Sequence, residues 1–305
     1  MASTLSKLSA SAALNVETFT SRVSWEFPGQ QGIGCNTISN QDTPNFLSFL
    51  GELRAHPTGK SLIITAAVPN SPWPDPNGNP SDISPFAKLL DHIAVMNYDI
   101  WGSWSPAVGP DAPLNDTCAS PQYQQGSAMS AVQAWTTAGL PTSQLVLGVP
   151  SYGHSFLVKE SVALTEQGDI TEYPRFEPEQ PRGDSSDDEP GTDVCGTEGG
   201  WGGLFNFWGL VEGRFLDQRG KPLQGIHYRY DKCSQTVRCG NGCYLPTAEL
   251  MHDTQSISPT FTTQPHKSWS RSMTQSPLKQ RENSLKTLVY EDMRCGKLLG
   301  IIETS

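Results

Sequence analysis

Acidic and aromatic residues stand at the ends of several apolar runs in this sequence, where they could act together on one ligand. One run leads into Trp25-Glu26-Phe27, a second ends in the segment Met96–Trp101, and a third is followed by Ser151-Tyr152. Carboxyl groups protonate or stabilise a glycosidic centre, and flat aromatic rings stack on the apolar faces of sugars. These residue types favour glycoside chemistry. The alternative is that the rings only pack at a rim and that Glu26 is a surface acid.

Apolar runs that alternate with amphipathic stretches predict the elements that position these residues. Buried strands are predicted over Arg22–Phe27, Ser61–Val68, Ile93–Tyr98 and Gln144–Pro150. Helices are predicted over Asp42–His56, Pro85–Asp91 and Ser127–Ala138. Strands and helices that alternate at this spacing form parallel sheets, so the predicted fold class is α/β. In parallel α/β barrels the functional groups gather at the carboxyl ends of the strands, where the acidic and aromatic residues stand.

The composition argues against several functional classes. The chain has 305 residues, 21 of them basic, and a formal net charge of −10. Nucleic-acid binding through a basic surface is therefore not expected. No stretch approaches 18 consecutive apolar residues, so no membrane span is expected. The apolar run Ala10–Leu14 is shorter than the hydrophobic region of a signal peptide and is broken by serine, so we predict no signal peptide in this sequence.

Changes in composition divide the chain into segments. Residues 1–20 form an atypical N-terminal segment, and residues 21–236 carry the patterned domain, in which 151–236 is a distinct turn-rich part. Residues 237–305 have weak apolar periodicity and many serines and threonines, so we predict a poorly ordered tail there.

Most of the negative charge is concentrated in one stretch. Eleven acids and two arginines lie between Glu160 and Asp193. We interpret this stretch as a solvated surface segment. A cation-binding loop around Asp184, Asp187, Asp188 and Glu189 is the alternative, although the stretch lacks the glycine and glutamate spacing of a known calcium loop.

The cysteines and one sequon suggest an oxidising compartment. Seven cysteines leave one unpaired if the others form disulfides. Cys35 with Cys118, and Cys195 with Cys233, are the pairings that we consider possible. Asn115-Asp116-Thr117 is a glycosylation sequon, which matters only in a secreted protein. Both features point mildly to secretion.

Four segments of this sequence resemble sequences of fungal chitinases of glycoside hydrolase family 18. They are WEFPGQQGIGCN (25–36), AVMNYDIWGSWS (94–105), LVLGVPSYGHSF (145–156) and NFWGL (206–210). The resemblance covers about residues 23–236 and implies a (β/α)8 TIM barrel with an inserted α+β segment. The four predicted strands then correspond to the fourth to seventh strands of the barrel, so we expect an incomplete barrel with residues 151–236 as the insertion.

The resemblance also implies a reaction and a set of site residues. The family cleaves β-1,4-linked N-acetylglucosamine in chitin with retention, and the 2-acetamido group of the substrate acts as the nucleophile. By resemblance, Glu26 is the proton donor and Tyr98 positions the acetamido group. The expected substrate-binding residues are Trp25, Met96, Asn97, Asp99, Trp101 and Tyr152. We expect no cofactor, and no metal, because no histidine or cysteine pair completes a zinc site with Cys239 and Cys243. The resemblance implies chitin or chito-oligosaccharides as partners and an extracellular location.

One departure from the family pattern leaves three functions open. The family strand carries three aspartates, the last of them two residues before the glutamate, where this chain has Phe19, Arg22 and Ser24. The serine hydroxyl carries no negative charge, and the loss of such a group costs several powers of ten in rate. The first function is a chitinase with impaired activity. The second is a non-catalytic chitin-binding lectin, and the third is a truncated, non-functional product.

Overall fold

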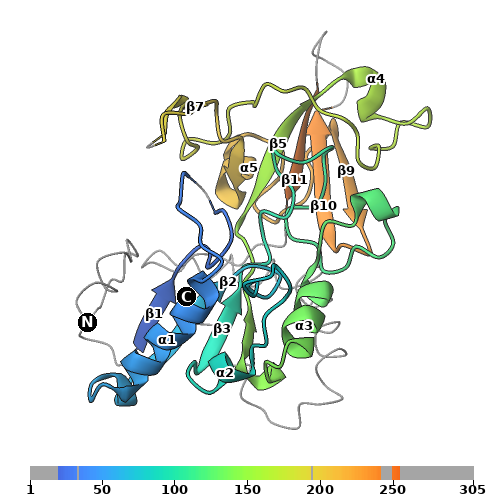
Figure 1. Ribbon diagram of the computed structural model, residues 1–305. Helices are drawn as coiled ribbons and strands as arrows, with labels where there is room; N and C mark the ends of the chain where they lie inside the picture. Colours follow the sequence, from blue (N-terminus) through green and yellow to red (C-terminus); the bar gives the residue numbers. More distant parts are fainter. Residues whose placement is uncertain (1–19, 33, 194, 242–248, 255–305) are drawn as a thin grey trace. The chain divides into compact units, whose positions relative to one another are not determined.

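The computed structural model describes residues 20–32, 34–193, 195–241 and 249–254 (Figure 1). The chain divides into two compact units, Met1–Met96 with Met129–Gly148, and Asn97–Ala128 with Val149–Ser305. The predicted N-terminal segment 1–20 lies outside the described residues except for its last residue. Most of the predicted tail 237–305 lies outside them as well.

The first unit contains the predicted parallel sheet. Its strands are β1 (Thr20–Ser24), β2 (Ile63–Val68), β3 (His92–Val95) and β4 (Leu145–Leu147), and they neighbour one another in this order. All three pairings are parallel, as predicted, and the pairing of β1 with β2 ends at Ser24 opposite Ala67. The strands are shorter than predicted. Strand β2 ends at Val68, because the proline that follows has no backbone N–H to donate.

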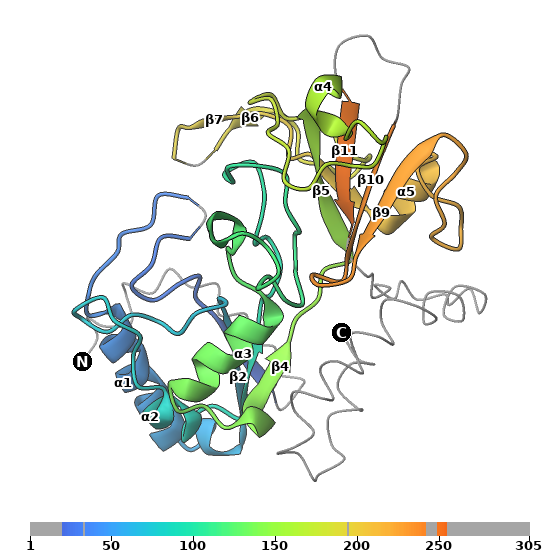
Figure 2. The same ribbon diagram turned by 90° about the vertical axis from the view of Figure 1, so that its right-hand side faces the viewer.

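Helices cover one face of this sheet (Figures 1 and 2). They are α1 (Asp42–Ala55), α2 (Ser84–Ala87) and α3 (Ala128–Thr137), with short 3₁₀ turns at Gly59–Ser61 and Thr142–Gln144. Alternate residues of β2, namely Ile64, Ala66 and Val68, share one apolar cluster with Phe46 of α1 and Trp135 of α3. Residues two apart in a strand lie on the same face, so these helices pack on that face of the sheet.

The parallel sheet does not close on itself within the described residues. It has four strands, whereas the resemblance implies the eight of a barrel. The structure therefore confirms an α/β unit with the predicted strands and shows no closed barrel. No helix in the described part of the chain is long and apolar enough to cross a membrane.

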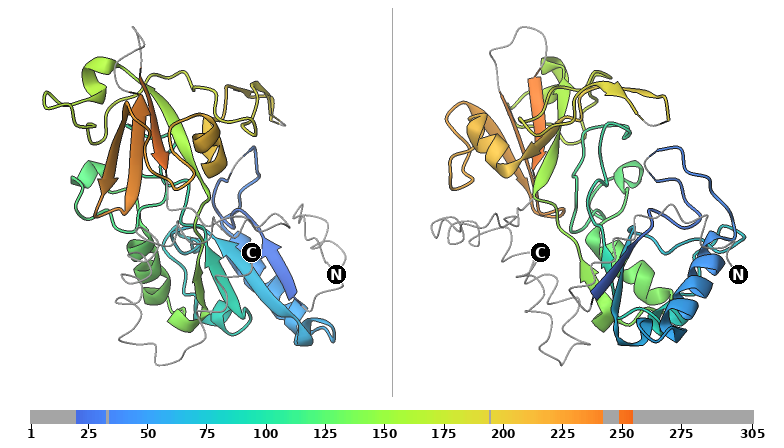
Figure 3. Two further views of the ribbon diagram at one scale, coloured as in Figure 1. Left: turned by 180° about the vertical axis from the view of Figure 1, so that it is seen from behind. Right: turned by 90° about the vertical axis from the view of Figure 1, so that its left-hand side faces the viewer.

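The second unit is built on a five-stranded antiparallel sheet (Figure 3). Its strands, in spatial order, are β8 (Leu204–Asn206), β5 (Tyr152–Val158), β11 (Glu249–Thr254), β10 (Thr236–Asn241) and β9 (Ile226–Asp231). The sheet therefore extends beyond residue 236, where the composition changes. Helices α4 (Glu160–Ala163) and α5 (Phe207–Glu212), a 3₁₀ turn at Pro121–Tyr123 and the small pair β6 (Gly191–Thr192) and β7 (Glu198–Gly199) complete this unit.

Two apolar clusters stabilise the second unit. Phe156 and Val158 of β5 pack with Val108 and Ile170 from the connecting segments. Phe205 of β8 and Leu210 of α5 belong to another cluster, which also contains Cys239 of β10. An antiparallel sheet flanked by short helices agrees with the α+β character that the resemblance implies for residues 151–236.

The observed disulfide differs from both pairings considered from the sequence. Cys118 is bonded to Cys233, with 6.3 Å between their Cα atoms. The pairings Cys35–Cys118 and Cys195–Cys233 are therefore wrong, although Cys35 and Cys195 are also disulfide-bonded. The observed pairing is possible because Leu114 donates its backbone N–H to the carbonyl oxygen of Ser234 (2.8 Å), which brings the two segments together.

Candidate functional site

Asp99 is the centre of a polar cluster in the second unit. Its Oδ1 accepts a hydrogen bond from the hydroxyl of Tyr152 (2.8 Å) and lies 2.9 Å from Nε2 of His154. Tyr152 and His154 are two residues apart in β5, so their side chains lie on the same face of the strand. The backbone of Asp99 is left-handed, with φ of 55°, a conformation that aspartate tolerates better than most residues. Two of these three residues, Asp99 and Tyr152, were predicted from the sequence.

Asp111 supports the cluster from a buried position. Its Oδ1 accepts the backbone N–H of Asp99 (2.7 Å) and lies 3.5 Å from Nε2 of His154. Burial raises the pKa of the Asp111 carboxyl, against the opposing effect of His154. Burial disfavours the charged form of His154, but hydrogen bonds and charges from Asp111 and Asp99 outweigh it and raise the pKa of His154 to about 10. His154 therefore carries a positive charge at neutral pH and lies beside Asp99 and Asp111.

Both pKa shifts predict that the folded chain loses stability as the pH rises. A group whose pKa is raised on folding binds its proton more tightly in the folded state. The contribution of His154 is thus complete below its ordinary pKa of 6.5 and is lost as the pH rises through about 10. We expect the urea concentration at the midpoint of unfolding to decrease as the pH is raised from 6.5 to about 10. In the His154→Gln chain this decrease should be smaller. His227→Gln, in the edge strand β9, is the control, and an equal slope in the wild type and His154→Gln would contradict the assignment.

The same three side chains have the spacing of a metal site. One ligand atom each from Asp99, Asp111 and His154 lies within 4.8 Å of the other two. Imidazole with two carboxylates suits several divalent transition metals. Oδ1 of Asp99 and Oδ1 of Asp111 already accept hydrogen bonds from the protein.

Two aromatic rings border the cluster. Tyr98 meets Tyr152 edge to face, with 6.3 Å between ring centroids. Trp104 meets His154 in the same way at 5.7 Å, and 63% of Trp104 is exposed to solvent. Gly102 leaves room for this indole, because a Cβ at that position would lie 2.4 Å from the ring. Trp104 therefore presents a flat apolar face beside Asp99, whose side chain is 44% exposed.

Trp101 and Asn97 lie inside the second unit, not on its surface. Trp101 is fully buried, and a Cβ at Gly109 would lie 2.1 Å from its ring. Asn97 is also fully buried, and its Nδ2 donates to the carbonyl oxygen of Pro113 (3.4 Å). Both residues therefore support the segments that carry Tyr98, Asp99 and Asp111.

The remaining predicted site residues belong to the first unit. Trp25 follows strand β1 and packs edge to face on Phe46, with 5.7 Å between ring centroids. Glu26 is exposed directly after it, and the peptide bond between Glu26 and Phe27 is cis. Met96 is half-buried and donates its backbone N–H to the carbonyl oxygen of Val68 (2.8 Å). The structure thus brings Tyr98, Asp99 and Tyr152 together in one unit and places Trp25, Glu26 and Met96 in the other.

Sequence reasoning missed three members of the cluster. His154 could have been found, because it follows Tyr152 at the two-residue spacing of one strand face. Trp104 stands in the motif AVMNYDIWGSWS but was not selected. Asp111 lies in a connecting segment without periodicity, and no pattern in the sequence marks it.

Two acids of the acidic stretch have structural partners. Asp187 accepts the backbone N–H groups of Gly183 (2.7 Å), Gly203 (3.0 Å) and Leu204 (2.9 Å). Asp184 accepts those of Ser186 (2.8 Å) and Asn206 (2.6 Å). The solvated surface segment that we predicted is therefore anchored to β8 by two of its own carboxylates.

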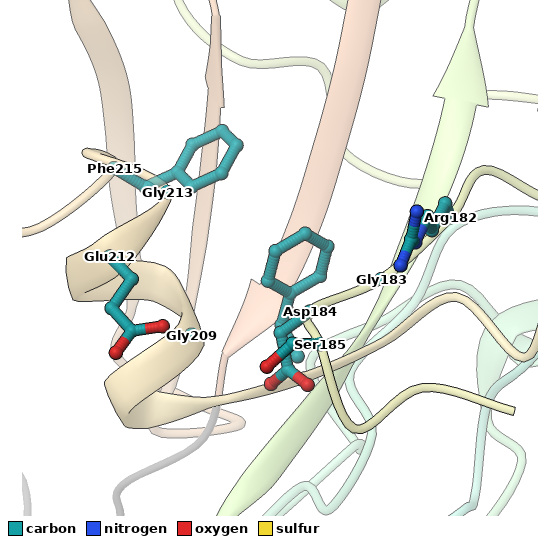
Figure 4. Close-up of a pocket in the computed structure, with 9 residues that line it drawn as sticks. Arg182, Gly183, Asp184, Ser185, Gly209, Glu212, Gly213 and Phe215 are labelled. Carbon is teal, nitrogen blue, oxygen red and sulfur yellow. The ribbon is translucent and has the colours of Figure 1, made fainter.

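A shallow cavity of about 340 Å³ lies beside this segment (Figure 4). It is lined by Arg182, Gly183, Asp184, Ser185, Phe205, Gly209, Glu212, Gly213 and Phe215. Asp184 and Glu212 stand on different walls of it in Figure 4. The cavity contains none of the predicted site residues.

Comparisons with known proteins agree on one family. A "chitinase-like effector" of Moniliophthora roreri is 51% identical over 234 residues, which are 75% of this chain and 55% of that protein. A chitinase crystal structure from Rhizomucor miehei aligns with a TM-score of 0.63 and 28% identity over 75% of this chain and 60% of that one. A class V chitinase mutant from Nicotiana tobaccum in complex with NAG4 aligns with a TM-score of 0.54 and 21% identity, over 80% and 58% of the two chains.

The family assignment rests on a long continuous match. This chain spans about half the length of the curated relative from Moniliophthora roreri. Residues 23–223 match the glycosyl hydrolases family 18. This match contains Glu26, Tyr98, Asp99, Tyr152 and His154. The chain therefore belongs to the glycosyl hydrolases of family 18.

Proposed function

We propose that this chain binds chitin and chito-oligosaccharides through the surface formed by Tyr98, Asp99, Trp104 and Tyr152. The observation that carries the proposal is the Asp99 carboxylate, which Tyr152 and His154 hold at 2.8 and 2.9 Å beside the exposed ring of Trp104. A fixed carboxylate accepts hydrogen bonds from sugar hydroxyl and amide groups, and a flat ring covers the apolar face of a sugar. The Nicotiana tobaccum relative in complex with NAG4 supports this ligand class.

The buried residues have a supporting role in this proposal. Trp101 fills the interior under the segment that carries Asp99, and Asp111 fixes the Asp99 backbone. A site is selective when rotamers of the contacting side chains are held by packing and by further hydrogen bonds. Trp101, Asn97 and Asp111 are thus positioning residues, and Tyr98, Asp99, Trp104 and Tyr152 are the residues that contact the sugar.

Truncation of the exposed indole is expected to weaken binding. Trp104→Ala should lower the affinity for chitotetraose about tenfold, which is about 1.4 kcal/mol, a usual loss for a truncated anchor residue. Isothermal titration calorimetry and chitin pull-down measure this change. Trp208→Ala, which removes another exposed indole (39%) from helix α5, is the matched control and should leave binding unchanged. Equal losses in both variants would refute a specific role for Trp104.

Hydrolysis is the second candidate function. Glu26 is retained at the end of strand β1, at the carboxyl edge where parallel α/β enzymes carry their catalytic groups. In this proposal Glu26 donates a proton to the leaving oxygen, the 2-acetamido group of the substrate attacks the anomeric carbon, and water then opens the cyclic intermediate with retention. The uncharged Ser24 gives this intermediate no electrostatic stabilisation. In this proposal the chain binds chito-oligosaccharides and hydrolyses them slowly.

An extracellular location accompanies this function. The cystine Cys118–Cys233 and the disulfide-bonded Cys35 and Cys195 suit an oxidising compartment. Chitin is an extracellular polymer, so a secreted chain would meet its ligand.

A further inference from the structure

We propose that Asn115 carries an N-linked glycan. Asn115-Asp116-Thr117 is the only Asn-X-Ser/Thr sequence of the chain in which X is not proline. Such a sequon is glycosylated when it passes through the secretory lumen in an accessible loop. The inference rests on the extracellular location proposed above and does not depend on carbohydrate binding.

The structure leaves the acceptor amide accessible. Asn115 is half-buried and Thr117 is exposed, in a stretch without helix or strand before Pro121. The backbone N–H of Thr117 donates to Oδ1 of Asn115 (3.2 Å), so the amide oxygen has a partner. Nδ2 of Asn115, the atom that would carry the sugar, makes no hydrogen bond with the described part of the chain.

The middle residue of the sequon has the opposite environment. Asp116 is buried, and its Oδ2 accepts the backbone N–H of Gly126 (2.9 Å). This contact anchors the loop without involving Asn115 or Thr117. A glycan on Asn115 is therefore compatible with the folded loop.

The disulfide next to the sequon closes too late to block the modification. Cys118 is bonded to Cys233, which lies 115 residues further along the chain. At a synthesis rate of about 5–20 residues per second, Cys233 leaves the ribosome roughly 6–23 s after Cys118. The sequon therefore stays unconstrained during that interval, and the extended segment can enter a glycosyltransferase.

The modification is a group transfer from a lipid diphosphate-linked oligosaccharide. Nδ2 of Asn115 attacks C1 of the first N-acetylglucosamine, and the new C–N bond replaces the bond between C1 and the phosphate oxygen. Nδ2 loses one proton, and the lipid diphosphate leaves with the bonding electron pair. No oxidant or reductant takes part.

The test is secretion of the full chain behind a cleavable leader from a yeast host, followed by peptide N-glycanase. We expect the chain in the medium to gain mobility on digestion and Asn115 to be converted to aspartate, which peptide mass spectrometry detects. Asn115→Gln and Thr117→Ala should abolish the shift, and Thr117→Ser should keep it.

A blocked sequon in the same chain gives a matched control. Asn79-Pro80-Ser81 has the sequon pattern with proline in the middle, and Asn79 and Pro80 are exposed. Pro80→Ala should therefore add a second glycan and a second mobility step. A secreted wild-type chain without a glycan overturns the proposal, whatever Pro80→Ala gives. That result would contradict only the glycosylation of Asn115, and the proposed extracellular location and carbohydrate binding would remain.

Discussion

Replacement of Ser24 by aspartate is expected to raise the hydrolysis of chito-oligosaccharides by at least about 100-fold. Ser24 is the last residue of strand β1 and stands two residues before Glu26. By resemblance, the family carries an aspartate there, which polarises the acetamido group and stabilises the positive charge that develops on the intermediate. Loss of one preorganised electrostatic group costs about 10²–10³ in rate. Its restoration should recover a similar factor, measured as fluorophore release from a chitotriose substrate.

Two further variants separate catalysis from a general effect of added charge. Ser24→Asp combined with Glu26→Gln should lose the gain, because the proton donor is absent. Thr20→Asp adds the same charge four residues earlier in β1, on the strand face that Ser24 shares, and should not raise the rate. If Ser24→Asp folds, binds chitotetraose as the wild type does and remains as slow, hydrolysis by Glu26 is refuted and carbohydrate binding alone remains.

The parallel elements of the first unit could be predicted because their signals are local. The run SLIITAAV ends in a proline and gives strand β2, and Asp42-Thr43-Pro44 begins helix α1 at the predicted residue. Strand ends were less predictable, since they depend on where the neighbouring strand stops pairing. Ser24 ends β1 opposite Ala67, and the residues that follow are therefore outside the sheet.

The polar cluster could be predicted only in part because its members are joined by tertiary contacts. Asp99 and Tyr152 stand in recognisable motifs, but Asp111 reaches them from a connecting segment through contacts with the Asp99 backbone and with His154. The sequence around Asp99 also does not show which of Trp101 and Trp104 is exposed to solvent. Trp101 is buried and Trp104 is exposed, and this difference depends on the packing of the segments around them.

The disulfide illustrates the same limit. Four cysteines allow three pairings, and sequence alone does not select among them. Cys118 and Cys233 are 115 residues apart, and they meet because residues 114 and 234 share a backbone hydrogen bond. No spacing pattern in the sequence encodes that contact.

Replacement of Arg238 by methionine is expected to stabilise the second unit by about 1–3 kcal/mol. Arg238 lies in β10 opposite Asp253 of β11 and is 1% exposed. Its guanidinium lies beside Tyr173, but none of its three nitrogens has a hydrogen-bond partner in good geometry within the described residues. An uncompensated buried charge costs about 3–5 kcal/mol. The guanidinium lies 5.1 Å from the ring centroid of Tyr173, and this cation–π contact returns at most about 2 kcal/mol. Methionine has a similar length and carries no charge, so the free energy of unfolding in urea should increase.

Arg229 is the matched control, because it faces Arg238 across the pairing of β9 with β10. Unlike Arg238, it forms an ion pair with Glu172, and its Nη1 donates to the carbonyl oxygen of Ile170 (2.9 Å). Arg229→Met should therefore lower the free energy of unfolding by up to about 1 kcal/mol, as for other partly exposed ion pairs. Arg238→Lys keeps the charge and should not stabilise the chain. If Arg238→Met instead lowered the free energy of unfolding, as Arg229→Met should, the prediction would be wrong. The Arg238 guanidinium would then have polar partners in solution that stabilise its charge.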